Sequence, residues 1–198
     1  MTLNISLIYE QCLEYFKCHL ESETLFSTTW KLKNNFSVKI LLISVSEITT
    51  FLLFAEGSSL RQMALNATTS RRIPLKVLAS KPYALDFDFL EEKVYWTDIT
   101  LGTISRAYLN GSSQETVVRG GLNNPYGLAV DPFGRNIYWT DSTEQVIEIA
   151  STDGLYRRVL IKDNLQDPRD IILDVTRGYT NVSHSLCDCF KDYSSQFV

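Results

Sequence analysis

Short apolar runs separated by turn-forming residues dominate the middle of the chain. They predict strands joined by tight turns, and the clearest four are Tyr126–Val130, Ile137–Asp141, Val146–Ser151 and Arg157–Ile161. Asp131–Gly134 and Asp153-Gly154 supply the turns, and Asp-Gly is a strong hairpin signal because both positions accept a positive φ. In the third strand we expect Ile147 and Ile149 on one side and Glu148 on the other. The pattern therefore predicts an antiparallel, four-stranded unit.

The same unit occurs twice, with a spacing of 43 residues. The tetrad Tyr95-Trp96-Thr97-Asp98 returns as Tyr138-Trp139-Thr140-Asp141, and residues 84–126 align with residues 127–169 without a gap and with twelve identities. One shared tetrad could arise by chance, but a gapless register over a whole period could not. Four antiparallel strands every 40 to 50 residues, roughly, are what a β-propeller blade requires. The sequence therefore predicts an all-β fold, a partial β-propeller.

Weaker copies extend the repeat over residues 51–178, enough for about two complete four-stranded blades plus part-blades. Residues 1–50 and 179–198 lack the register, and we expect an irregular leader of doubtful origin and an irregular tail. Residues 38–55 form the most apolar window, but Glu47 and several Ser and Thr residues interrupt it. A membrane helix needs about 20 apolar residues, so a buried strand is favoured, with a transmembrane helix as the alternative.

Each tetrad has a structural role in such a blade. Tyr and Trp alternate across a middle strand, so their rings can fill the spaces between neighbouring blades. The β-branched Thr suits the pleat, and the final Asp can accept N–H bonds from the next loop. We therefore interpret all eight residues as building the blades rather than binding a ligand: Tyr95, Trp96, Thr97, Asp98, Tyr138, Trp139, Thr140 and Asp141.

Composition and charge argue against several functional classes. The 198 residues carry 19 Lys and Arg against 23 Asp and Glu, a net charge of −4, so nucleic-acid binding through a broad basic surface is not expected. The sequence holds no phosphate loop, G-x-S-x-G or H-E-x-x-H motif, and we expect neither catalysis nor a cofactor. The Cys and His residues lie near the two ends and fit no metal-site spacing well: Cys12, Cys18, His19, His184, Cys187 and Cys189.

The tetrads, their spacing and the run Gly127–Asp131 resemble the YWTD, or class B, repeats of the low-density-lipoprotein receptor family. Ala84–Asp88 and Tyr95–Ser112 resemble the Wnt co-receptor branch of its receptor-related proteins, the third propeller in particular. The resemblance implies six blades on the extracellular side of a membrane-anchored cell-surface protein. Because 51–178 is shorter than six blades, we expect a fragment of such a receptor. The first 20 residues also lack the pattern of a secretory signal.

The resemblance also implies a ligand class and a ligand-binding face. In related propellers, Wnt proteins or their secreted antagonists bind a face built partly by the loops between the fourth strand of one blade and the first strand of the next. The residues that stand in or beside these loops are Arg119, Tyr126, Lys162 and Asp163. Asp163 matches an acidic position of the branch, whereas Arg119 replaces an expected acid and Ile161 an expected aromatic residue. The alternative is that all four are solvated loop residues.

Three rival functions remain open at this stage. The chain could come from an endocytic receptor of the same family, from a nidogen-like extracellular-matrix protein, or from a truncated product without independent function. Five Asn-x-Ser/Thr sequons occur, at Asn4, Asn35, Asn66, Asn110 and Asn181. Asn110 stands at a predicted hairpin turn and Asn66 at the equivalent place one blade earlier, so these two are the candidate N-glycosylation sites.

Overall fold

The computed structural model shows strands and their connections, and no helix, among the residues that it describes. These residues are 27–32, 36–41, 51–64, 67, 69–174, 179–184 and 190–192. Side chains are described for 51–64, 67 and 69–173. These segments contain no helix that is long and apolar enough to cross a membrane.

Sixteen strands of the described residues form four antiparallel sheets. The first sheet holds β1 (Ser27–Leu32), β2 (Phe36–Leu41), β3 (Phe51–Glu56), β4 (Ser59–Ala64) and β5 (Arg71–Arg72). The second holds β6 (Pro82–Asp88), β7 (Lys93–Asp98), β8 (Thr103–Tyr108) and β9 (Glu115–Arg119). The third holds β10 (Pro125–Asp131), β11 (Asn136–Asp141), β12 (Val146–Ser151) and β13 (Arg158–Ile161). The fourth holds β14 (Pro168–Asp174), β15 (Tyr179–His184) and β16 (Phe190–Asp192).

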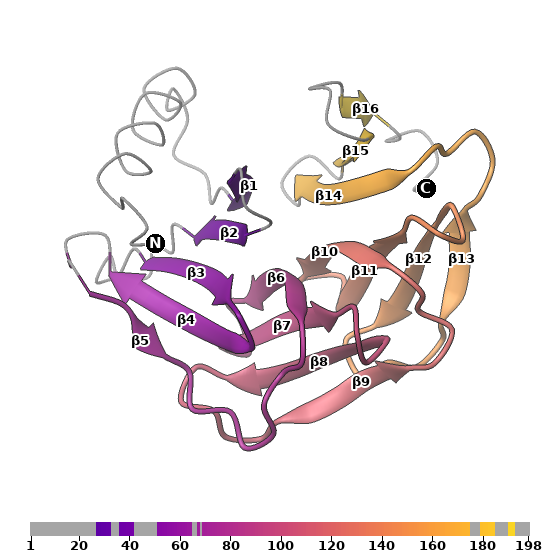
Figure 1. Cartoon of the computed structure of the whole chain (residues 1–198). Coiled ribbons are helices and arrows are strands. Elements are labelled where there is room, and N and C mark those ends of the chain that lie inside the picture. The colour runs from indigo at the N-terminus through magenta and orange to yellow at the C-terminus, as the bar shows by residue number, and fades with distance from the viewer. Residues whose placement is uncertain are drawn as a thin grey trace.

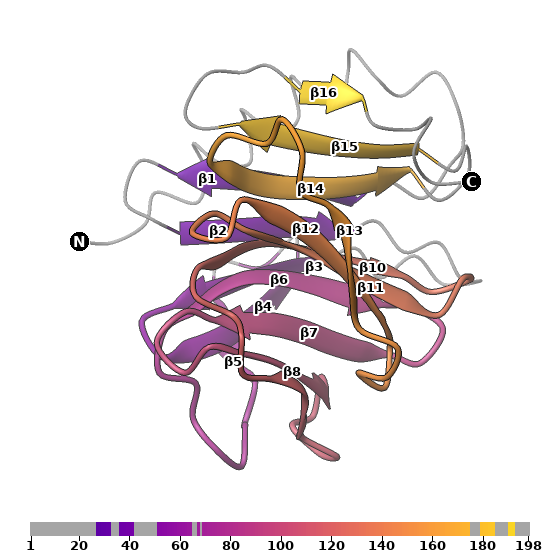
Figure 2. The same ribbon diagram turned by 90° about the vertical axis from the view of Figure 1, so that its right-hand side faces the viewer.

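The sheets follow one another in an arc, each stacked on the next like the blades of a propeller (Figure 1). In every sheet, consecutive strands along the chain are neighbours. The innermost strands β6, β10 and β14 lie side by side around the axis with β2 next to β6, and β1, the innermost strand of the first sheet, contacts β14. Figure 2 shows that the strands run across the molecule between the same two faces. This arrangement confirms the predicted all-β, propeller-type fold.

The strands predicted in the second copy of the repeat are confirmed within a residue at each end, as β10 to β13. The side chains of β12 alternate as expected, but neither side of the strand faces solvent. Ile147 packs toward the fourth sheet and Ala150 toward the second, and Glu148 is also buried. Both faces of β12 are therefore covered, because a sheet lies on each side of it.

Strands also form outside the segment that carries the repeat. β1 and β2 lie within residues 1–50, and β15 and β16 lie within residues 179–198, where we expected irregular structure. Backbone pairing needs only an extended neighbouring strand. Strands can therefore form in these segments without the 43-residue pattern. The two ends of the apolar window 38–55 are strands in β2 and β3, and residues 42–50 lie outside the described residues.

The tetrad aromatics form the cores between sheets, as predicted. Trp96 is 2% exposed and packs in a cluster with residues of the first sheet, including Leu53. Its neighbour Tyr95, 0% exposed, points to the other side and packs with Leu128 and Trp139 of the third sheet. Burial of such aromatic side chains is a large apolar contribution to stability. The middle strand β7 therefore joins the sheets on both of its sides.

Two equivalent glycines allow a close approach to the outer segment of the preceding blade. Gly111 and Gly154 occupy the tight turns between the third and fourth strands, with φ of +80° and +85°. A Cβ on Gly111 would lie 2.1 Å from the carbonyl oxygen of Pro74, and one on Gly154 would lie 2.0 Å from that of Val117. Pro74 and Val117 are themselves 43 residues apart, so the same contact recurs between successive sheets. Each turn therefore needs glycine both for its backbone conformation and for its contact.

We expect Gly154→Ala to destabilise the fold more than Gly57→Ala, a matched control. Gly57 also has a positive φ, +58°, but a Cβ there has nothing within 4 Å. The control should lose about 1 kcal/mol through the left-handed conformation alone. Gly154→Ala should lose about 2 kcal/mol more because backbone must move to admit the methyl group. Urea unfolding of the two variants measures the difference, and equal losses would contradict the contact.

Candidate ligand-binding face

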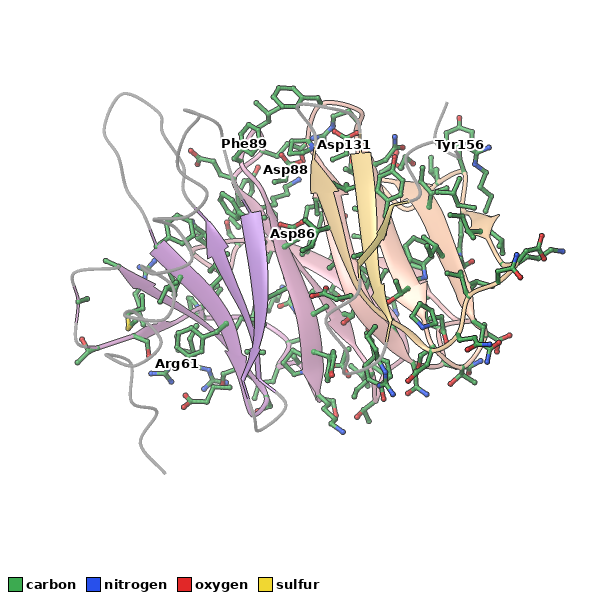
Figure 3. All side chains as sticks on the ribbon, turned by 90° about the horizontal axis from the view of Figure 1, so that it is seen from above. Arg61, Asp86, Asp88, Phe89, Asp131 and Tyr156 are labelled. Atoms are coloured by element: carbon green, nitrogen blue, oxygen red, sulfur yellow. The ribbon has the colours of Figure 1, made fainter. Side chains whose placement is uncertain are left out.

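The strand ends define two opposite faces. The loop face is formed by residues 76–81, 99–102, 120–124, 142–145 and 162–167. The turn face is formed by residues 89–92, 109–113, 132–135 and 152–156. In Figure 3 the turn-face end of the strands carries Asp88, Phe89 and Asp131, and Arg61 lies at the other end. The connections from one sheet to the next all lie on the loop face, so it is the face that the family resemblance assigned to the ligand.

Buried carboxylates hold the loop face in place. Asp98 and Asp141, 1% and 0% exposed, end the second strand of their sheets and each accept backbone N–H bonds of 2.6–3.2 Å from two segments. The donors are Ser80, Lys81, Thr100 and Leu101 for Asp98, and Asn123, Asn124, Thr143 and Glu144 for Asp141. The predicted role of these aspartates is confirmed, and it extends to the loop that precedes the sheet.

A row of side chains follows the axis just inside the loop face. Tyr83, Tyr126 and Arg169 are spaced 43 residues apart and stand beside irregularities in the pairing of the first and second strands. The Tyr83 and Tyr126 ring centroids are 4.7 Å apart, and the Arg169 guanidinium lies 4.4 Å from the Tyr126 centroid. A bulge re-aims side chains in this way. Thr97 and Thr140 support it, since their hydroxyls accept N–H bonds of 3.0 and 2.9 Å beside the bulges.

The four predicted ligand-face residues do not form one cluster. Arg119 ends β9 and Lys162 follows β13, both exposed on the rim of the loop face, and Asp163 is exposed beside Lys162. Tyr126 is half-buried in the row, with Tyr83 and Arg169 packed against its ring. Only the side chains of Arg119, Lys162 and Asp163 are thus fully available to a partner. Whether any of the four binds a ligand stays a prediction.

Arg157 braces the loop that carries Arg119 and Tyr126. Its guanidinium donates to the carbonyl oxygens of Gly120 and Gly121 at 2.6 and 2.8 Å. It also donates to both carboxylate oxygens of Glu148 at 2.9 and 2.8 Å. Glu148 in turn accepts the Trp139 indole N–H at 3.0 Å. Such a charge-assisted, two-pronged contact fixes geometry as well as contributing energy.

Gln114 performs the same bracing one sheet earlier. It stands 43 residues before Arg157, and its side-chain amide exchanges two hydrogen bonds of 2.8 Å with the backbone of Val77, which is the counterpart of Gly120. Sequence reasoning missed both braces because the two residue types differ. The signal that could have found them is that both side chains are long and polar at one fixed position of the repeat.

Ion pairs link the second and third sheets at the turn face. The Arg135 guanidinium donates to the buried Asp88 carboxylate at 2.6 Å and also pairs with Glu91. Lys93 and Arg106 are the other cations around Glu91, at 3.0 and 3.8 Å. Asp88 also accepts backbone N–H bonds from Leu90 and Glu91 within its own turn. The pairing with Arg135 across the sheets was not predicted.

The charges around Glu91 shift its titration. Burial alone would raise the pKa of this carboxyl, but the hydrogen bond from Lys93 and the charges of Arg135, Lys93 and Arg106 outweigh it. The pKa of Glu91 therefore lies below its usual value. On the loop-face row, burial raises the pKa of Tyr83, with a further contribution from Tyr126. Tyr83 therefore stays neutral, which suits a side chain that packs on another ring.

No cluster of three or more metal-ligating side chains is found among the side chains that the structure describes. The candidate metal ligands of the sequence lie elsewhere. Cys12, Cys18, His19, Cys187 and Cys189 are outside the described residues, and only the backbone of His184 is described. Asn66 is likewise outside the described residues, whereas Asn110 is exposed in the turn between β8 and β9.

Comparison with known proteins identifies the repeats. The family model for low-density lipoprotein receptor repeat class B matches residues 92–132 and 135–175. Each matched segment runs from the second strand of one sheet to the first strand of the next. The chain thus carries two class B repeats, and the YWTD assignment made from the sequence is confirmed.

Similar proteins include low-density lipoprotein receptor-related proteins and nidogens. Low-density lipoprotein receptor-related protein 5 of Homo sapiens is 44% identical over 74 residues, which are 37% of this chain and 4% of the relative. Low-density lipoprotein receptor-related protein 4 of Homo sapiens is 42% identical over 75 residues, again 37% and 4%. Nidogen-2 of Mus musculus is 40% identical over 85 residues, 40% and 6%. The chain thus spans only a small part of each relative's length.

A solved structure supports the fold. A chain in a crystal structure of a nidogen/laminin complex superposes with a TM-score of 0.64 and 22% sequence identity, over 81% of this chain and 69% of that one. At this identity the similarity shows the architecture and nothing of the ligand.

Replacing the buried carboxylate of Asp141 should release the loops that it holds on the loop face. We expect Asp141→Ala to lower the free energy of unfolding by about 3 kcal/mol, because four N–H donors lose a charged acceptor. Asp131→Ala is the control, since Asp131 is less buried and, within the described residues, accepts N–H bonds from Phe133 and Gly134 alone. It should lose about 1 kcal/mol. Denaturant unfolding gives both values, and an Asp141→Ala loss no larger than the control would refute the fastening role.

The Glu91 contacts make stability depend on pH. Because the folded-state pKa of Glu91 is lowered, its stabilisation is present above the unfolded-state pKa of roughly 4.3 and is lost as the pH falls through the folded-state pKa. Unfolding midpoints measured from about pH 5 down to pH 3 should therefore fall less steeply in Glu91→Gln than in the wild type. Glu92→Gln removes an exposed neighbouring carboxylate that makes no ion pair within the described residues, and it should keep the wild-type slope.

Proposed function

We propose that this chain, which carries two class B repeats, is a non-catalytic extracellular module that binds a secreted protein through its loop face. The supporting observation is the construction of that face. Buried Asp98 and Asp141 fasten its loops from within, and Arg157 and Gln114 brace them from the next sheet. A rigid surface of this kind lowers the entropic cost of ordering on binding.

The ligand class that we propose is Wnt proteins or their secreted antagonists. Its support is the resemblance of the second blade to the Wnt co-receptor branch, together with relatives among the low-density lipoprotein receptor-related proteins. Exposed Arg119, Lys162 and Asp163 lie on the rim of the loop face and offer both signs of charge to such a ligand. We place the parent protein at the plasma membrane, with the propeller on the extracellular side.

A matrix function is the second candidate. Nidogen-1 and Nidogen-2 are 43% and 40% identical to this chain over partial segments, and the nidogen of the similar structure is bound to laminin. A nidogen-like module would use the same propeller to bind a matrix protein. An endocytic receptor of the receptor-related family is a third possibility, and its cytoplasmic internalisation motif would distinguish it from a signalling receptor.

Charge reversals at the two ends of β13 provide a matched test of the loop face. Lys162 follows the loop-face end of this strand, and Arg158 begins it near the turn face, both exposed. In surface-binding measurements with a purified Wnt, a purified Wnt antagonist and laminin, we expect the antagonist or the Wnt to bind. We expect Lys162→Glu and Asp163→Lys to weaken that binding about tenfold, or about 1.4 kcal/mol. Arg158→Glu should bind like the wild type.

The outcomes separate the candidates. Binding of laminin alone would favour the matrix function over the Wnt class. Equal weakening by Lys162→Glu and Arg158→Glu would show that general charge, and not the loop face, carries the interaction. Wild-type affinity in both loop-face variants would contradict the proposed face. Thermal unfolding of each variant provides the folding control, because all three positions are exposed.

A further inference from the structure

We propose that Asn110 is an N-glycosylation site and that its glycan stands on the turn face, away from the ligand-binding face. The sequence Asn110-Gly111-Ser112 is a sequon, and the structure places it in the tight turn between β8 and β9 with Asn110 and Ser112 both exposed. The proposal requires only that the chain enters the secretory pathway. It is independent of which ligand the loop face binds.

The hydrogen bonds of the turn leave the reactive atom available. The side-chain carbonyl oxygen Oδ1 of Asn110 accepts from the Ser112 backbone N–H at 2.9 Å and from the Ser112 hydroxyl at 2.6 Å. The amide nitrogen Nδ2, which is the atom that takes the sugar, donates to none of the residues that the structure describes. A glycan on Nδ2 therefore breaks no hydrogen bond of the turn.

The next blade shows that the turn itself has no need of this nitrogen. Asp153 stands 43 residues after Asn110, in the equivalent turn. Its Oδ1 accepts from the Leu155 backbone N–H at 3.1 Å and from the Ser151 hydroxyl. A carboxylate oxygen thus serves the turn as well as the amide oxygen does. The Nδ2 of Asn110 contributes nothing that the fold requires, which is consistent with a role in modification.

Gly111 fixes the direction in which Asn110 points. The glycine is buried, and the Cβ that it lacks would lie 2.1 Å from the Pro74 carbonyl oxygen. The turn is therefore pressed onto the preceding sheet on its Gly111 side, and Asn110 is left on the solvent side. A large, hydrated glycan at Asn110 would project from the turn without separating the sheets.

The other sequons offer no comparable site in the part of the chain that is described. Asn181 lies in the middle of β15, where it is paired with Ile172 on one side and Asp192 on the other. Asn4, Asn35 and Asn66 are outside the described residues.

The modification is a group transfer with defined partners. The donor is an oligosaccharide joined through the anomeric carbon of N-acetylglucosamine to a polyisoprenyl pyrophosphate. The Asn110 Nδ2 attacks that carbon, a C–N bond forms, and the bond from the carbon to the pyrophosphate oxygen breaks. The lipid pyrophosphate leaves, and the proton lost from Nδ2 passes to the transferase or to solvent.

Cell-free translation in the presence of microsomes tests the site on the whole chain and does not require that the chain be secreted. The chain follows a cleavable secretory signal, and the products are digested with or without peptide N-glycosidase. Peptide mass spectrometry should find the peptide that holds Asn110 glycosylated in the wild type and unmodified in N110D and S112A. An unmodified wild-type peptide from chains inside the microsomes would overturn the proposal.

N110D also tests separately whether the fold can dispense with the Asn110 amide nitrogen Nδ2. Because Asp153 serves the equivalent turn, N110D made in bacteria, without glycan, should unfold at the same denaturant midpoint as the wild type from the same source. A clear loss of stability would show that the Asn110 amide has a structural role and would remove this support. Ligand binding through the loop face should be unchanged in both variants, so failure of the glycan site and failure of the proposed function are distinguishable.

Discussion

Each inner sheet of this protein must be buried on both of its faces, and only neighbouring sheets can cover them. The middle strand β7 shows the consequence most clearly, since Tyr95 packs on one side and Trp96 on the other and neither is more than 2% exposed. Much else in the fold follows from this constraint. Gly111 and Gly154 permit close stacking at the turns, and Asp98 and Asp141 tie down the loops that lead from one sheet to the next.

The repeat made much of this fold predictable. In the tetrad, two aromatic residues point to opposite faces of the strand and an aspartate ends it. The sequence alone therefore indicates that both faces are covered and that the aspartate binds the adjoining loop. The extent of these contacts was harder to predict, because Asp141 accepts N–H bonds from Asn123 and Asn124, which lie 18 and 17 residues earlier in a loop. Local sequence gives the acceptor but not the distant donor.

The 43-residue pattern could not predict contacts made by residues that differ between the copies of the repeat. Arg135 reaches Asp88 across 47 residues, and buried Asp86 accepts the Val130 N–H of the neighbouring innermost strand at 2.8 Å, yet the position equivalent to Asp86 is Ala129. Glu148 was expected only to lie opposite Ile147 and Ile149; it is buried between sheets, with Arg157 as its ion-pair partner. The same holds for the candidate site. Sequence placed Tyr126 near the ligand face, whereas its packing between Tyr83 and Arg169 depends on a bulge.

The phase of the repeat relative to the sheets has an engineering consequence. The matched segments 92–132 and 135–175 begin at the second strand of one sheet and end at the first strand of the next. The loops 120–124 and 162–167 therefore lie inside a segment, with the strands on both sides of each loop, and not at a boundary. Recombination that exchanged one whole segment for another would transfer a complete loop together with its flanking strands. The junctions would fall in the turns between first and second strands, on the opposite side of the molecule, so modular shuffling would exchange whole loops of the proposed ligand-binding face without cutting through that face.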